Sequence, residues 1–248
     1  MMVKPVIKVF KSSQTMSLFI AGEFIRMVNS AASETRTIVV ALSGGSTPEN
    51  MFRNLSKLSG REQVPWEAVH FFWGDERCVP PDYPDSNYGV ARDLLLNNIP
   101  IPKGNIHRIR GEAEPFQEKD RYAQEIRQFV PLSSEGIPQF HWIFLGLGVD
   151  GHTASIFPGT DTIHVRNQFC AAAVHPETGQ NRITLTLPVL NNANRVSFLI
   201  SGEAKRAIVE RILRDPEAEN KYPAAMVQPQ NAQLEWFIDR QAAVNLPM

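Results

Sequence analysis

Short runs of β-branched and aromatic residues alternate along the chain with longer segments in which apolar residues recur at helical spacing. The runs predict strands, and the longer segments predict helices with one apolar face. The expected strands are Val6–Phe10, Thr37–Leu42, Val69–Trp73, Trp142–Leu145, Phe169–Val174, Ile183–Leu187, Val196–Ser201 and Leu234–Phe237. The expected helices are Gln14–Ser30, Pro48–Leu58, Asn87–Asn97, Pro115–Phe129 and Glu203–Leu213.

This alternation is typical of an α/β protein with an open, mostly parallel sheet and helices on both faces. The proline-containing stretches at 79–84, 98–102 and 131–138 are typical of connections within a domain, and no internal repeat is present. We therefore expect residues 1–248 to form a single α/β domain. Ligands of such sheets lie beyond the carboxyl ends of the strands, so the segments that follow strands are the candidates for chemistry.

The first candidate segment, residues 43–48, lies between an expected strand and an expected helix. Thr47 should cap the helix and Pro48 should be its first residue. Free amide groups at the start of this helix would suit a phosphate or a sugar oxygen, although a tight turn with a capped helix explains the sequence equally well. The segment lacks the Lys-Ser/Thr ending of a nucleotide-binding P-loop. It also lacks the Gly-x-Ser-x-Gly nucleophile elbow, so its serines are poor nucleophile candidates. The candidate ligand-binding residues are Ser43, Gly44, Gly45, Ser46 and Thr47.

The second segment, Trp73-Gly74-Asp75-Glu76-Arg77, places two acids and an arginine just after a strand. Asp75 and Arg77 could hold sugar hydroxyls and a phosphate, because the planar guanidinium matches phosphate oxygens. A solvated surface ion pair is the alternative, and it is the favoured one for this segment taken alone.

The third segment, residues 145–158, contains Gly146, Gly148 and Gly151 in the spacing of a dinucleotide-binding loop. A dinucleotide site needs a long helix after the third glycine, and Pro158 followed by glycine prevents one. The same loop carries Asp150 and His152. An acid and an imidazole two residues apart in a glycine loop form a compact acid/base pair, which favours catalysis over a structural role.

Two further basic residues complete the candidate site: Arg182 opens a threonine-rich strand, and Lys205 lies in the first turn of an expected helix. A cation is uncommon in a first helical turn unless an anion lies nearby, because the amino end of a helix is itself positive. A lysine that points into solvent is the simple alternative.

The net charge of -1 and the pI near 6.6 offer no general attraction to nucleic acid or to an anionic membrane, so any anionic ligand needs a local cluster of basic residues. The two cysteines, Cys78 and Cys170, form no CxxC pair and are expected to be free thiols, and no metal-ligand spacing occurs. No stretch is long and apolar enough for a signal peptide or a membrane span, so we expect a cytoplasmic protein.

Four motifs, in this order and spacing, resemble the 6-phosphogluconolactonase family. They are Ser-Gly-Gly-Ser-Thr-Pro at 43–48, Trp-Gly-Asp-Glu-Arg at 73–77, Ser-Asn-Tyr at 86–88, and the glycine loop with Asp-Gly-His at 145–158; Arg-Ile-Thr-Leu-Thr at 182–186 and Ser-Gly-x-x-Lys at 201–205 extend the resemblance. The resemblance implies a Rossmann-like open sheet, shared with glucosamine-6-phosphate deaminases, and a phosphorylated sugar lactone as substrate in the oxidative pentose phosphate pathway. It also implies that His152 is the acid/base residue beside Asp150, and that the other candidates surround the substrate.

Lactone hydrolysis needs no cofactor and no metal, because the strained ester already reacts slowly with water. Two alternatives belong to other functional classes. A deaminase or isomerase of the same fold would need a carboxylate shortly after the histidine, where this chain has Thr-Ala-Ser-Ile-Phe-Pro. A non-enzymatic sugar-phosphate sensor would need a DNA-reading helix, which the sequence does not predict. The sequence does not indicate the oligomeric state.

Overall fold

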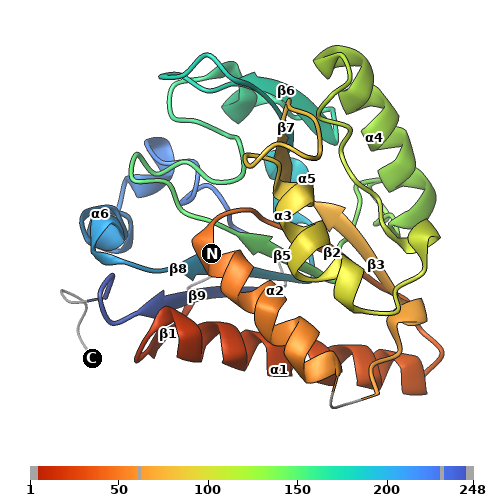
Figure 1. Ribbon diagram of the computed structural model, residues 1–248. Helices are drawn as coiled ribbons and strands as arrows, with labels where there is room; N and C mark the ends of the chain where they lie inside the picture. Colours follow the sequence, from red (N-terminus) through yellow and green to blue (C-terminus); the bar gives the residue numbers. More distant parts are fainter. Residues whose placement is uncertain (1–4, 61–62, 230–231, 244–248) are drawn as a thin grey trace.

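The computed structural model describes residues 5–60, 63–229 and 232–243, and its main layer is a six-stranded sheet in which every neighbouring pair of strands is parallel (Figure 1). The strands follow the order β1-β9-β8-β5-β2-β3. Their bounds are β1 Val6–Phe10, β2 Ile38–Leu42, β3 Val69–Trp73, β5 Trp142–Leu145, β8 Arg195–Ile200 and β9 Gln233–Asp239.

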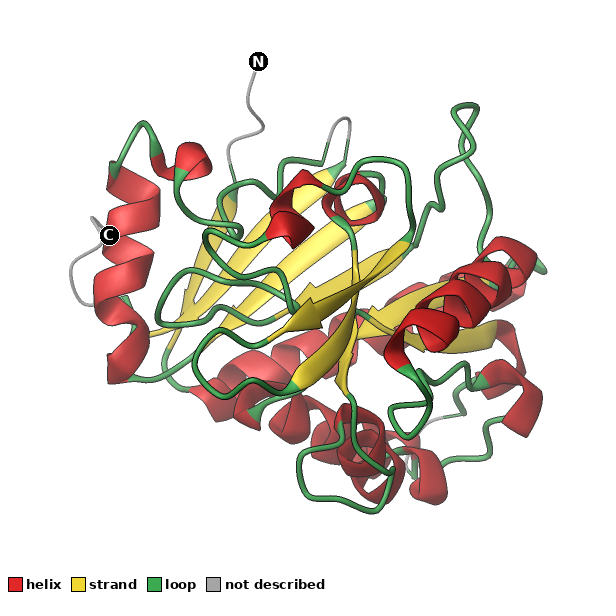
Figure 2. Ribbon diagram, turned by 90° about the horizontal axis from the view of Figure 1, so that it is seen from above, coloured by secondary structure: helices red, strands yellow, loops and turns green. Residues whose placement is uncertain are grey.

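Helices cover this sheet on both sides (Figure 2), which explains why every residue of the central strands β2 and β5 is buried. Helices α1 and α2 lie side by side along one face (Figure 1). The bounds of the helices are α1 Ser13–Ser33, α2 Ser46–Ser59, α3 Asn87–Leu94, α4 Pro115–Phe129, α5 Leu187–Asn191 and α6 Arg206–Arg214. The predicted α/β class with a mostly parallel sheet is therefore confirmed. Within the described ranges, no helix has both the length and the apolar character needed to cross a membrane.

A second, antiparallel sheet of three strands was not expected. It consists of β4 Asp75–Arg77, β7 Asn181–Leu185 and β6 Cys170–Val174, with β7 in the middle. Strand β4 was not predicted, and the other two strands were expected in the parallel sheet. The physical reason is the turn at 176–179, which is too short for the crossover that parallel strands require and so returns the chain as a hairpin.

Several predicted boundaries also differ. Gly45, with φ of 105°, is the N-cap of α2, so the helix begins at Ser46 and the prediction that Thr47 is the cap was wrong. The hydroxyl of Thr47 instead lies 2.7 Å from the hydroxyl of Ser201, and this contact ties α2 to the end of β8. Lys205 likewise does not lie inside α6 but closes a short 3₁₀ turn at Glu203–Lys205 that precedes it.

The connections of the large sheet run in opposite directions from its centre. From β2 the chain moves outward to β3, whereas from β5 it moves to β8 on the other side, so β2 and β5 are neighbours whose following loops diverge. Such a switch point opens a crevice beyond the carboxyl ends of the two strands. The segments at 43–48 and 146–152 follow these strands.

Candidate active site

A pocket of about 380 Å³ lies at this switch point. It collects segments from the carboxyl ends of β2, β3, β5 and β8 together with the small antiparallel sheet. With the exception of Asp150, which is hydrogen-bonded to His152, every candidate site residue from the sequence lines it: Ser43, Gly44, Gly45, Ser46, Thr47, Asp75, Arg77, His152, Arg182 and Lys205.

Asp150 and His152 form a hydrogen-bonded pair at the edge of the pocket. Oδ1 of Asp150 lies 2.6 Å from Nδ1 of the imidazole and also accepts the backbone N–H of His152 at 3.2 Å. Burial is the largest single influence and disfavours the charged carboxylate, but the hydrogen bond with His152, the electrostatic attraction of that ring and the backbone hydrogen bonds together outweigh it and hold the pKa of Asp150 below its usual value. An ionised Asp150 accepts the proton on Nδ1, which leaves the lone pair of Nε2 available as a base.

Gly148 makes room for this pair. A Cβ atom at position 148 would lie 2.1 Å from Nδ1 of His152 and 2.4 Å from Oδ1 of Asp150, far inside van der Waals contact. The backbone of the loop closes on itself, because the N–H of Gly148 donates to the carbonyl of His152 at 2.9 Å. The glycines of this segment therefore serve a tight loop under the pair rather than a dinucleotide, and the chain after His152 forms turns instead of a helix.

Arg77 and Arg182 face each other directly across β4 and β7, so both guanidinium groups project from the same face of the small sheet. Burial and the neighbouring Arg77 lower the pKa of Arg182. In the part of the chain that the structure describes, neither arginine forms a salt bridge, and the buried Nε atoms of both lack a hydrogen-bond partner. Two adjacent, half-satisfied cations inside a pocket are what an anionic ligand requires.

Lys205 supplies a third positive charge. Burial lowers the pKa of its ammonium group, and the negative charge of Asp150 opposes this shift. Nearby, the first amides of α2 receive no cap from any described side chain, because the N-cap residue is Gly45. Unsatisfied amides at a helix start attract anions.

Asp75 and Glu76 are buried rather than solvated, so the surface ion pair considered for this segment is excluded. The carboxylate of Asp75 accepts the hydroxyl of Ser155 at 2.7 Å and the side-chain amide of Asn87 at 3.4 Å. Glu76 points away from the pocket and accepts the backbone N–H groups of Asn87 and Tyr88, each at 2.8 Å, at the start of α3. Asp75 therefore shapes the pocket wall, and Glu76 anchors the helix behind it.

Several residues that line the pocket were not among the predicted site residues. The polar ones are Asn87, Ser155, His175 and Ser201. Asn87, Ser155 and Ser201 lie in the motifs at 86–88, 145–158 and 201–205, although none of them was selected as a site residue. His175 lies outside every motif and gave no signal, because only the tertiary fold brings it to the pocket. Among the residues the structure describes, no cluster of metal-ligating side chains is found. Burial raises the pKa of Cys78 to about 11, which is consistent with a packing role.

A family model described as glucosamine-6-phosphate isomerases/6-phosphogluconolactonase matches residues 11–236. The chain is 44% identical over 207 residues to the 6-phosphogluconolactonase of Haemophilus influenzae, covering 84% of this chain and 86% of that protein. It is 37% identical over 242 residues to the human 6-phosphogluconolactonase, covering 96% and 92% of the two chains.

A solved structure has the same arrangement over almost the whole chain. The 6-phosphogluconolactonase of Trypanosoma brucei superposes with a TM-score of 0.88 at 29% identity and covers 98% of this chain and 99% of its own. Together with the Asp150–His152 pair in the crevice at the switch point, these matches lead to one conclusion. The chain belongs to the family of glucosamine-6-phosphate isomerases and 6-phosphogluconolactonases.

Proposed function

We propose that this protein hydrolyses 6-phospho-D-glucono-1,5-lactone to 6-phospho-D-gluconate, the step that its relatives' name describes. The observation that carries the proposal is the Asp150–His152 pair opening into a pocket with three cations, Arg77, Arg182 and Lys205. A base and a binding site for a phosphate are what a phosphorylated lactone requires.

In the proposed mechanism, Nε2 of His152 removes a proton from a water molecule as the water oxygen bonds to the lactone carbonyl carbon. The tetrahedral intermediate then breaks its bond to the ring oxygen, and Nε2 returns the proton to that oxygen, which becomes a hydroxyl group. Asp150 holds the imidazole in the required tautomer and stabilises the imidazolium between the two steps. The histidine therefore ends the cycle as it began, and no covalent intermediate forms.

The cations and the α2 amides hold the rest of the substrate. Arg77 and Arg182 present forked donors to phosphate oxygens, and Lys205 adds a charge near the acid/base pair. Ser43 and Ser46 line the pocket and can offer their hydroxyls to the sugar, whereas the hydroxyl of Thr47 already contacts that of Ser201. Binding energy from the phosphate fixes the reacting carbon, so these residues act on rate as well as affinity.

The arrangement of carboxylates disfavours a deaminase. Asp75 is the only carboxylate among the described residues that line the pocket, and both its oxygens accept hydrogen bonds from the pocket wall. Glu76 faces the start of α3. A separate carboxylate free to open the sugar ring is therefore missing from this part of the structure, whereas lactone hydrolysis needs only the one base.

The direct test measures formation of 6-phosphogluconate from freshly prepared lactone, with the spontaneous rate subtracted. A purified protein that does not exceed this background would contradict the proposal and favour a sugar-phosphate sensor. A cytoplasmic location is part of the proposal, since the charge of a phosphorylated sugar confines it to the compartment in which it is made; fractionation of cells that produce the protein tests this.

A further inference from the structure

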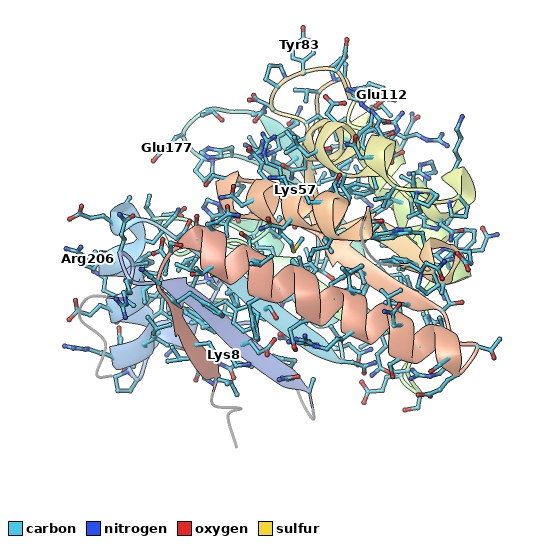
Figure 3. The ribbon with its side chains drawn as sticks, turned by 60° about the horizontal axis from the view of Figure 1, so that its bottom comes forward. Lys8, Lys57, Tyr83, Glu112, Glu177 and Arg206 are labelled. Carbon is cyan, nitrogen blue, oxygen red and sulfur yellow. The ribbon has the colours of Figure 1, made fainter. Side chains whose placement is uncertain are left out.

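His175 lies in the turn between β6 and β7 and lines the same pocket as the acid/base pair. Figure 3 labels Glu177 at the outer surface of this turn. The ring of His175 packs edge-on against the ring of Phe157, with centroids 4.9 Å apart. The ring of His152 also contacts Phe157, at the same centroid distance of 4.9 Å. Phe157 is buried, so it fixes the positions of both imidazoles within one pocket.

The register of the hairpin places His175 beside the arginine pair. Ala173 faces Arg182, and Val174 faces Asn181. The N–H of His175 donates to the carbonyl of Gln180 at 2.9 Å, which continues the ladder by one more pair. Side chains two residues apart on a strand share a face, so His175 is a diagonal neighbour of Arg182, on the face that also carries Arg77.

The turn itself determines which nitrogen of His175 carries the proton. Nδ1 accepts the backbone N–H groups of Glu177 at 3.2 Å and Thr178 at 3.3 Å. A ring nitrogen that accepts a hydrogen bond cannot carry a proton, so the proton of the neutral ring lies on Nε2. No described residue accepts a hydrogen bond from Nε2, on the side of the ring opposite the turn.

We propose that His175 is a specificity-determining residue that donates a hydrogen bond from Nε2 to a phosphoryl oxygen held by Arg77 and Arg182. The proposal rests on the proposed function, because it adds a donor to the phosphate site of that substrate. It gives the turn at 176–179 a role beyond joining two strands: the turn amides occupy Nδ1 and leave Nε2–H as the donor for a phosphate oxygen. His175 takes no part in the proton transfers, which remain with His152.

Two substitutions separate this role from support of the turn. In His175→Asn, the side-chain oxygen can still accept the two turn amides, as Nδ1 does, but the donor at Nε2 is lost. In His175→Gln, the longer side chain can place an amide N–H near the position of Nε2. His164→Asn is the matched control, because His164 is exposed and lies outside this pocket.

The measurements are KM and kcat for the phosphorylated lactone, the same constants for unphosphorylated glucono-1,5-lactone, and the Kd of 6-phosphogluconate by calorimetry. We expect His175→Asn to raise KM and this Kd about tenfold, the effect of one hydrogen bond to a charged group, with kcat changed less than about twofold. The unphosphorylated lactone should be unaffected, and His175→Gln should recover most of the affinity.

Equal affinity of the wild type and His175→Asn for 6-phosphogluconate would overturn the proposal, and so would an equal loss on both lactones, which would indicate a structural role. Calorimetry measures binding without catalysis, so the test of His175 does not depend on the proposed activity. A wild type that binds 6-phosphogluconate but does not hydrolyse the lactone would contradict the activity alone. A wild type that binds no 6-phosphogluconate would contradict both.

Discussion

Oδ1 of Asp150 lies 2.6 Å from Nδ1 of His152, and this contact leaves Nε2 as the one nitrogen of the imidazole that can act on a ligand in the pocket. Both residues of the pair belong to one short loop, which also contacts Phe157 and Ala224. The proposed chemistry can therefore be tested by small changes within that loop.

Replacing His152 with Asn should lower kcat by roughly two to four orders of magnitude, the usual effect of losing a general base. The side chain is partly exposed, so the fold should survive. Steady-state kinetics measure kcat of the wild type and the variant, and thermal denaturation curves show whether the variant is folded. A folded variant with nearly normal kcat would show that another group removes the proton from water.

Substituting Gly148 with Ala should reduce kcat by about a hundredfold or more, because the new Cβ would lie 2.1 Å from Nδ1 of His152 and displace the ring. Gly146→Ala is the control in the same loop, since its Cβ would meet the hydroxyl of Ser43 at 3.8 Å, an ordinary van der Waals contact. Equal activities of the two variants would mean that the loop tolerates movement of the Asp150–His152 pair.

The order of strands and helices could largely be predicted from the sequence. The bounds of β1, β3, β5 and α4 agree with the predicted ranges, because hydrophobic periodicity is local and is preserved in the fold. β4 could not be predicted, since its three residues are polar and become a strand only by pairing with β7, more than a hundred residues later. That residues 1–248 form a single domain stays a prediction.

The loops that carry the candidate site could be predicted, because each of them follows an expected strand. The strand order brings those loops to one edge, so residues chosen at separate motifs line one pocket. His175 was not predicted as a site residue, because its position beside Arg182 depends on the register of the β6–β7 hairpin. Thr47 was misassigned as a cap because its partner, Ser201, is distant in the sequence.

Removing either Arg182 or Lys205 should separate phosphorylated from unphosphorylated substrates. We expect Arg182→Gln and Lys205→Met to lower kcat/KM for the phosphorylated lactone by about ten- to a hundredfold, and to leave glucono-1,5-lactone almost unchanged. Arg240→Gln, at an exposed residue outside the pocket, serves as the control. A parallel loss on both substrates would assign these residues to the structure of the pocket.

Glu76 should make stability depend on pH. Burial raises the pKa of its carboxyl group from 4.5 to about 6, although three backbone N–H groups favour the ionised form. Between these two values the unfolded chain is ionised while the folded protein keeps the proton, so the free energy of unfolding falls as pH rises, by about 2 kcal/mol. This contribution is full below pH 4.5 and is lost as pH rises through 6.

Urea denaturation at several pH values measures this effect as the difference between the wild type and Glu76→Gln, which cannot ionise. Glu219→Gln, at an exposed position, controls for the general loss of a negative charge. A constant difference between wild type and Glu76→Gln from pH 4.5 to 6 would mean that the backbone donors keep Glu76 ionised in the folded protein.

The last prediction distinguishes a lactonase from a deaminase. Loss of ammonia from glucosamine 6-phosphate, coupled to aldose-ketose isomerisation, needs one base for carbon-bound protons and a separate group that opens the sugar ring. After His152 the chain offers only Thr153, Ala154 and Ser155, and the carboxylate of Asp75 is held by Ser155 and Asn87. We therefore expect phosphogluconolactone hydrolysis and no ammonia release, which a coupled ammonia assay on the purified protein can measure. Ammonia turnover comparable to lactone hydrolysis would mean that Asp75 or Asp150 acts as the second group, and Asp75→Asn would then abolish ammonia release if Asp75 were responsible.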